Sequence, residues 1–126
     1  MDDPQPTLLL VEDDSEQRKI LQLVFQTGGY RVLDAENGIR ALEVLEQEEI
    51  DIIVSDLMMP EMDGAELLRK VRESEKNKSL PFVVLTAVQN IEQQQAMIDL
   101  GADDYCLKGS SRKTLLRSAA KVLCLV

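Results

Sequence analysis

The chain has 126 residues, of which 44% are hydrophobic and 29% are charged, and its formal net charge is −9. This length and composition suit a folded domain with a full core and exclude a disordered chain. The acidic balance argues against direct binding of nucleic acid. The absence of histidine excludes His-based acid–base catalysis, His metal sites and a phosphohistidine on this chain.

The chain also lacks signals for export or membrane insertion. No apolar run approaches the roughly 18–20 residues that a membrane helix needs, and the acidic residues 1–6 do not form the basic start of a signal peptide. Cys106 and Cys124 form no CxxC motif, and two reduced thiols are typical of cytosolic proteins. We therefore expect a cytoplasmic protein with no membrane partner.

The first half of the chain alternates apolar strands with amphipathic helices. Residues 7–11 form a continuous apolar run that predicts a buried strand, and a helix follows over residues 15–27. A short strand covers residues 30–33, a helix begins at Asn37, and residues 50–55 form the third strand. The apolar faces predicted for these two helices are Leu21, Val24 and Phe25, then Ile39, Leu42 and Leu45.

The second half repeats the alternation. A helix begins near Gly64, a strand covers residues 82–86, a weakly amphipathic helix covers residues 90–100, and the fifth strand is residues 104–107. A last helix ends the chain. Its predicted apolar face is Leu115, Ala119, Val122 and Leu123, and its predicted cap is Ser110 or Ser111, while Ser15 is the predicted cap of the first helix.

Five strands that alternate with five helices predict an α/β fold with a doubly wound, parallel sheet and helices on both faces. The short strands favour the order 2-1-3-4-5. In this order strands 1 and 3 are neighbours, so Glu12 and Asp13 would lie beside Asp56 at the carboxyl edge of the sheet, where ligands bind in such folds. The whole chain, residues 1–126, is predicted to be one domain.

Polar residues end four of the five predicted strands: Glu12-Asp13, Asp56, Thr86 and Lys108. Clustered carboxylates repel one another, so this arrangement gains nothing in stability without a cation. An oxygen-only cluster suits Mg²⁺, which accepts phosphate oxygens. A lysine and a threonine hydroxyl suit a phosphoryl group, and one carboxylate can then serve as its acceptor.

These motifs together resemble the receiver domains of two-component response regulators, including chemotaxis regulators, which have a flavodoxin-like fold. The resemblance covers residues 7–125. It depends on four motifs: Leu10-Val11-Glu12-Asp13-Asp14, the segment 56–64 with sequence DLMMPEMDG, Thr86-Ala87, and Gly101-Ala102-Asp103-Asp104-Tyr105 with the following Lys108.

The resemblance implies a phosphorylation-controlled switch and a role for each matching residue. Asp56 would be the phosphoacceptor; Glu12, Asp13 and Asp56, with the backbone carbonyl of Met58, would hold Mg²⁺; Thr86 and Lys108 would bind the phosphoryl oxygens; Tyr105 would turn inward with Thr86 on activation. The donor would be a sensor histidine kinase or a histidine phosphotransfer protein, and the chain would slowly dephosphorylate itself without being an enzyme. The fourth helix, fifth strand and fifth helix would form the effector or dimer contact.

One position departs from the family pattern. Receivers usually carry a proline after the lysine, in a cis bond, and this chain has Gly109. A cis bond before a residue other than proline costs about 2.5–4 kcal/mol. We therefore expect a trans bond between Lys108 and Gly109.

Other functions remain as alternatives. A degenerate receiver that acts only as a protein-docking module would not need the intact acidic site. An aspartate-nucleophile phosphatase of the haloacid dehalogenase type needs a second aspartate two residues after the first, where this chain has Met58. A flavin carrier with the same strand order would find its phosphate repelled by the acidic residues 12–14.

Overall fold

The computed structural model describes residues 5–59, 61–87 and 89–124. In these ranges five parallel strands form one sheet in the order β2-β1-β3-β4-β5, which confirms the predicted order. The strands are β1 (Thr7–Val11), β2 (Arg31–Ala35), β3 (Ile52–Asp56), β4 (Phe82–Thr86) and β5 (Asp104–Leu107). The helices are α1 (Ser15–Thr27), α2 (Gly38–Gln47), α3 (Gly64–Glu73), α4 (Ile91–Asp99) and α5 (Arg112–Cys124).

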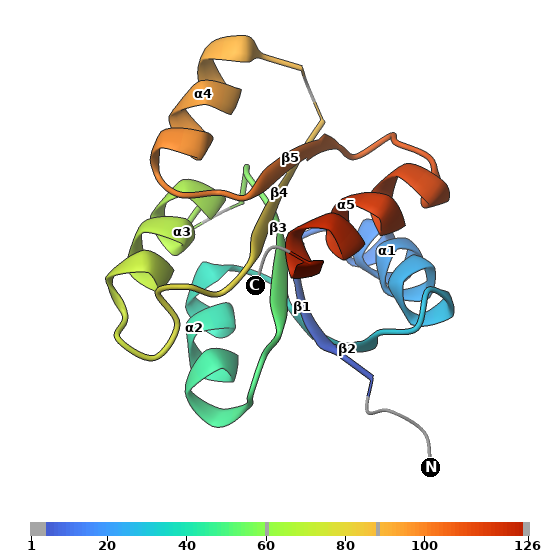
Figure 1. The fold of residues 1–126 in the computed structure, drawn as a ribbon, viewed down its shortest axis with the longest axis horizontal. Helices are drawn as coiled ribbons and strands as arrows, with labels where there is room; N and C mark the ends of the chain where they lie inside the picture. Colours follow the sequence, from blue (N-terminus) through green and yellow to red (C-terminus); the bar gives the residue numbers. More distant parts are fainter. Residues whose placement is uncertain (1–4, 60, 88, 125–126) are drawn as a thin grey trace.

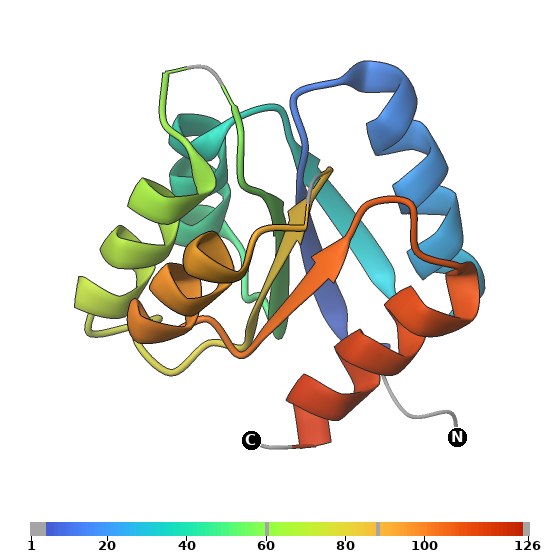
Figure 2. The ribbon, with the colours of Figure 1, turned by 90° about the horizontal axis from the view of Figure 1, so that it is seen from above.

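The sheet lies between two helical layers. Figure 1 shows α2, α3 and α4 on one face of the sheet and α1 and α5 on the other, and Figure 2 shows the same division from above. Because side chains alternate along a strand, β1 sends Leu9 and Val11 into the core on the first face and Leu8 and Leu10 into the core on the second. All five residues of β1, β3 and β4 are buried, as continuous apolar runs predict.

Local details at the helix ends differ in part from the sequence predictions. Asp14, and not Ser15, caps α1, because the Asp14 carboxylate accepts hydrogen bonds from the backbone amides of Glu16 and Gln17. Of the two serines proposed as the cap of α5, Ser111 is the one whose hydroxyl accepts from the Thr114 amide.

One residue predicted to face the core is exposed. Ile39 follows the first residue of α2 and is 47% exposed, whereas Ala41, Val44 and Leu45 of this helix are buried. The buried face of α2 is therefore rotated relative to the predicted one, and the small residue Ala41 is buried where Ile39 was predicted to be.

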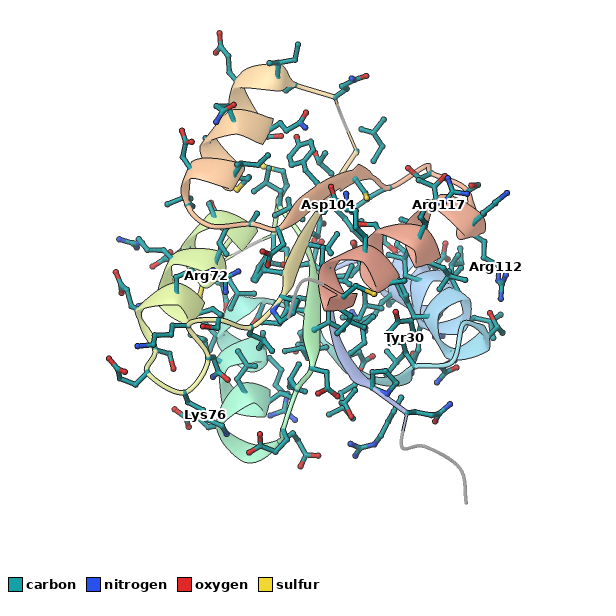
Figure 3. The ribbon with its side chains drawn as sticks, in the orientation of Figure 1. Tyr30, Arg72, Lys76, Asp104, Arg112 and Arg117 are labelled. Atoms are coloured by element: carbon teal, nitrogen blue, oxygen red, sulfur yellow. The ribbon has the colours of Figure 1, made fainter. Side chains whose placement is uncertain are left out.

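Helix α4 is the least anchored helix. Met97 is its one buried residue within the described ranges, and near its start Tyr105 Oη donates a 2.7 Å hydrogen bond to Gln93 Oε1. Beyond its end, Arg72 of α3 (Figure 3) donates to the backbone carbonyl of Gly101 at 2.7 and 3.0 Å and pairs with Asp103 at 3.1 Å. The two ends of α4 are thus held by contacts of different strength.

No cis peptide bond occurs in the described residues, so the predicted trans bond between Lys108 and Gly109 is confirmed. None of the helices in the described ranges has the length and apolar character that crossing a lipid bilayer requires.

Candidate functional site

The carboxyl ends of β1, β3, β4 and β5 border a cavity of about 460 Å³. Its lining includes the strand-end residues named from the sequence, which are Glu12, Asp13, Asp56, Thr86 and Lys108. The doubly wound topology explains this meeting, because parallel strands deliver their last residues to the same edge of the sheet. The structure therefore brings together the strand-end residues that the sequence singled out.

Lys108 joins the two buried carboxylates. Its Nζ lies 2.8 Å from Asp56 Oδ2 and 2.9 Å from Glu12 Oε2, and only about a fifth of its side chain is exposed. Burial by itself would lower the pKa of Lys108, but the hydrogen bonds to Asp56 and then Glu12 outweigh burial and hold that pKa above its usual range. The lysine therefore stays a cation and offsets part of the repulsion expected between the acids.

Glu12 is the most buried acid of the site, with no exposed surface. Its pKa is raised, first by burial and then by the negative charge of Asp56, against the opposing effect of Lys108. Glu12 Oε2 accepts no hydrogen bond of good geometry from the described residues, even though the lysine nitrogen lies close to it. A buried carboxylate oxygen without a proper donor is costly, and a bound cation would satisfy it.

Asp13 differs from the other two acids because it is exposed to solvent. Glu12, Asp13 and Asp56 nevertheless each offer a carboxylate oxygen, and these oxygens lie within 4.8 Å of one another. Three carboxylates and one ammonium leave two negative charges when all are ionised, which matches a divalent cation. The hard oxygen donors and the open, solvent-facing side of the cluster fit Mg²⁺, which keeps several waters when bound.

The remaining residues named from the sequence lie around this cluster. Thr86 ends β4 and is 4% exposed. Met58 lines the cavity with a largely exposed side chain, and its backbone amide lies 3.4 Å from Asp56 Oδ1. Tyr105 is half-buried on β5 and donates its hydroxyl hydrogen to Gln93, which itself lines the cavity.

Sequence reasoning missed Gln93 and Arg18. The side chain of Arg18, on α1, donates from Nη1 to the backbone carbonyl of Glu12 at 2.8 Å and from Nε to Asp34 at 3.2 Å. Gln93 belongs to a run of three glutamines, residues 93–95, that is typical of a solvated helix face, and a single Arg on a helix is usually a surface residue too. Only the fold shows that both reach the carboxyl edge of the sheet.

Comparisons with known proteins agree with this geometry. A 14.6 kDa protein encoded in the sodA1 3′ region of Leptolyngbya boryana is 40% identical over 113 residues, which are 90% of this chain and 86% of that protein. The response regulator MprA of Mycobacterium ulcerans is 38% identical over 109 residues, or 86% of this chain, but the match spans only 46% of MprA.

A solved structure, the chemotaxis protein CheY4 of Vibrio cholerae, superimposes with a TM-score of 0.90 at 30% identity, covering 94% of this chain and 99% of that one. This similarity confirms the predicted flavodoxin-like receiver fold. The profile of the response regulator receiver domain matches residues 8–120. The chain therefore belongs to the response regulator receiver domain family of two-component signalling.

Proposed function

We propose that this chain is a phosphoacceptor switch in which Asp56 receives a phosphoryl group from a histidine kinase or a histidine phosphotransfer protein. The observation that carries this proposal is the contact of Lys108 Nζ with Asp56 at 2.8 Å, inside a cavity that the carboxylates of Glu12 and Asp13 also line. A cation fixed beside a carboxylate can take over the charge of an incoming phosphoryl group.

The transfer itself needs only positioning and charge. An Asp56 oxygen forms a bond to phosphorus while the bond between phosphorus and the donor's imidazole nitrogen breaks, and the electron pair returns to that nitrogen. Lys108 exchanges its contact with Asp56 for a phosphoryl oxygen, and the Thr86 hydroxyl donates to another. In the slow dephosphorylation, a water oxygen forms a bond to phosphorus while the bond between phosphorus and the Asp56 oxygen breaks, which regenerates the Asp56 carboxylate and releases inorganic phosphate.

Glu12, Asp13 and Asp56, with the backbone carbonyl of Met58, are the proposed Mg²⁺ ligands. Mg²⁺ would neutralise the negative charge of the phosphoryl oxygens during transfer. The unsatisfied Glu12 Oε2 supports the fit of this donor set. Since a ligand that binds only the folded state stabilises it, Mg²⁺ at about 100 times its Kd should add about 2.7 kcal/mol to the free energy of unfolding. No change in thermal stability at that concentration would contradict the metal site.

Phosphorylation can be tested directly. Acetyl phosphate with Mg²⁺ should add one base-labile phosphoryl group to the wild-type chain and none to Asp56→Asn, as read by intact mass spectrometry. The matched control is Asp99→Asn, which removes one carboxylate from the outer surface of α4. Equal labelling of wild type and Asp56→Asn would refute the assignment, and no labelling of wild type would favour the docking-module alternative.

The output surface is proposed to be the face made by α4, β5 and α5. Exposed apolar side chains lie on it, including Ile91 at 78%, Ile98 at 45% and Leu107 at 36% exposure. Such a surface suits an effector or a second receiver. The test is a change in self-association when beryllofluoride, a phosphoryl analogue, is added to the wild-type chain; an Ile98→Glu variant should lose that change.

A further inference from the structure

Arg18 connects three separate pieces of the fold. Its helix, α1, begins just after the acidic residues, and its guanidinium reaches back to the Glu12 carbonyl at 2.8 Å. The same group pairs with Asp34 at the end of β2 at 3.2 Å, and the Arg18 side chain is only 21% exposed. A planar guanidinium can make both contacts at once because its donors point in fixed directions.

The carbonyl that Arg18 binds belongs to the peptide unit between Glu12 and Asp13. A peptide unit is planar, so fixing its carbonyl also fixes its amide, which is that of Asp13. On the other side, the Glu12 amide donates to the Ala35 carbonyl at 3.0 Å, and the Asp14 amide donates to Glu12 Oε1 at 3.2 Å. No hydrogen bond holds the exposed Asp13 side chain within the described residues, so its direction depends on this backbone.

We infer that Arg18 is a positioning residue that orients Glu12 and Asp13 for divalent-cation binding; this inference rests on the proposed function. Asp34 completes the arrangement, since its carboxylate pairs with the guanidinium and offsets a positive charge that would otherwise lie beside a cation site. Arg18 is not one of the proposed Mg²⁺ ligands or phosphoryl-binding residues, and it acts through the main chain of Glu12.

Positioning by Arg18 and the charge of Arg18 predict opposite changes in divalent-cation affinity when the residue is removed. Removing a positive charge next to an acidic cluster should tighten binding of a divalent cation if electrostatics dominates. Removing a group that orients the ligands should weaken it, and partners of metal ligands typically contribute about 10–100-fold in affinity. The sign of the change therefore separates the two explanations.

The experiment is an Mn²⁺ titration of the full chain, with free Mn²⁺ read by electron paramagnetic resonance at a temperature where every variant is folded. Arg18→Ala is expected to weaken binding by about 10-fold. Arg18→Lys keeps the charge but lacks the planar fork, so it should also bind more weakly than wild type. The matched control is Arg40→Ala, which removes the same charge from a half-exposed arginine that borders the same surface hollow as Arg18 but does not contact Glu12.

Each outcome is decisive. Arg18→Ala that binds Mn²⁺ as tightly as wild type, or more tightly, overturns the inference while leaving the proposed function intact. Should Arg18→Ala fail to fold, Arg18→Lys decides, and wild-type affinity in that variant overturns the inference. A wild-type chain that binds no Mn²⁺ overturns the metal part of the proposed function and the inference with it. A change in Mn²⁺ affinity equal to that of Arg40→Ala would also overturn the inference, because Arg40 does not contact Glu12.

Discussion

Gly64 offers a quantitative test of how tightly the loop after β3 is packed. It is the first residue of α3, and its amide donates to the Leu57 carbonyl at 2.9 Å. A Cβ at this position would collide with the backbone carbonyl oxygen of Asp56 and would lie 3.0 Å from Leu57 Cα. Both obstacles are backbone atoms at the end of a buried strand, so they cannot move aside as a flexible side chain can.

The expected cost of Gly64→Ala follows from two opposing effects. Overpacking in a well-packed region costs about 1–3 kcal/mol. Alanine restricts the unfolded chain and so recovers about 0.4–1 kcal/mol. We therefore expect the free energy of unfolding to fall by about 1–2 kcal/mol. Because the displaced carbonyl belongs to Asp56, the rate of labelling by acetyl phosphate should also fall.

Two other glycines are matched controls for the same substitution in urea unfolding experiments. At Gly109 no atom lies within 4 Å of an added Cβ and φ is not positive, so Gly109→Ala should be neutral or stabilising by up to about 1 kcal/mol. At Gly38 the Cβ meets only the Met62 side chain, which can move, so the cost should be smaller than at Gly64. Equal stability of Gly64→Ala and Gly109→Ala would refute the packing argument.

Three further predictions concern charge and motion. The pKa of Asp104 is lowered in the folded state, because hydrogen bonds led by that of Ser118 outweigh burial. The Asp104 carboxylate therefore stabilises the fold above the ordinary carboxyl pKa, and this stabilisation is lost as pH falls through the lower folded value. In urea unfolding, Ser118→Ala should have a lower free energy of unfolding than wild type at pH 7, and the difference should disappear in acid. Lys108→Met should lower the free energy of unfolding of the metal-free chain by about 2 kcal/mol, as measured by thermal unfolding. This cost is smaller than that of breaking a fully buried ion pair, because the lysine is partly exposed, and Mg²⁺ should restore much of the lost stability. Tyr105→Phe removes the hydrogen bond to Gln93 and should speed amide exchange in the first turn of α4; unchanged exchange there would contradict this role.

The sheet and the carboxyl-edge cluster were predictable because both depend on pattern. Continuous apolar runs identify strands buried on both faces, and a parallel order then carries Glu12, Asp56 and Lys108 to the same edge. Helix faces were less predictable. Ile39 fits the helical period but is exposed, because the tertiary packing of α2 selected Ala41 instead.

Contacts that depend on side-chain reach were not predictable. Asp14 competes successfully with Ser15 for the cap of α1, although both residue types are good caps. Lys108 contacts Glu12, which lies 96 residues earlier in the chain, in addition to Asp56. The contact of Arg18 with the Glu12 carbonyl leaves no pattern in the sequence. Repulsion among the acids was predicted from the sequence, and burial, which raises the pKa of Glu12 more than the charge of Asp56 does, was not.

The unequal attachment of α4 has a mechanical consequence. Arg72 holds the backbone just beyond the C-terminal end of the helix. Among the described residues, one side-chain hydrogen bond, from Tyr105 to Gln93, joins the first turn of the helix to the sheet. The helix can therefore rotate about its C-terminal end near Gly101, and its N-terminal end then moves furthest. For nine residues at about 1.5 Å each, a swing of about 20° would displace the free end by roughly 4–5 Å. The N-terminal end borders, through Gln93, the cavity that Asp56 also lines, so the part of the helix that would move furthest lies beside the acidic cluster.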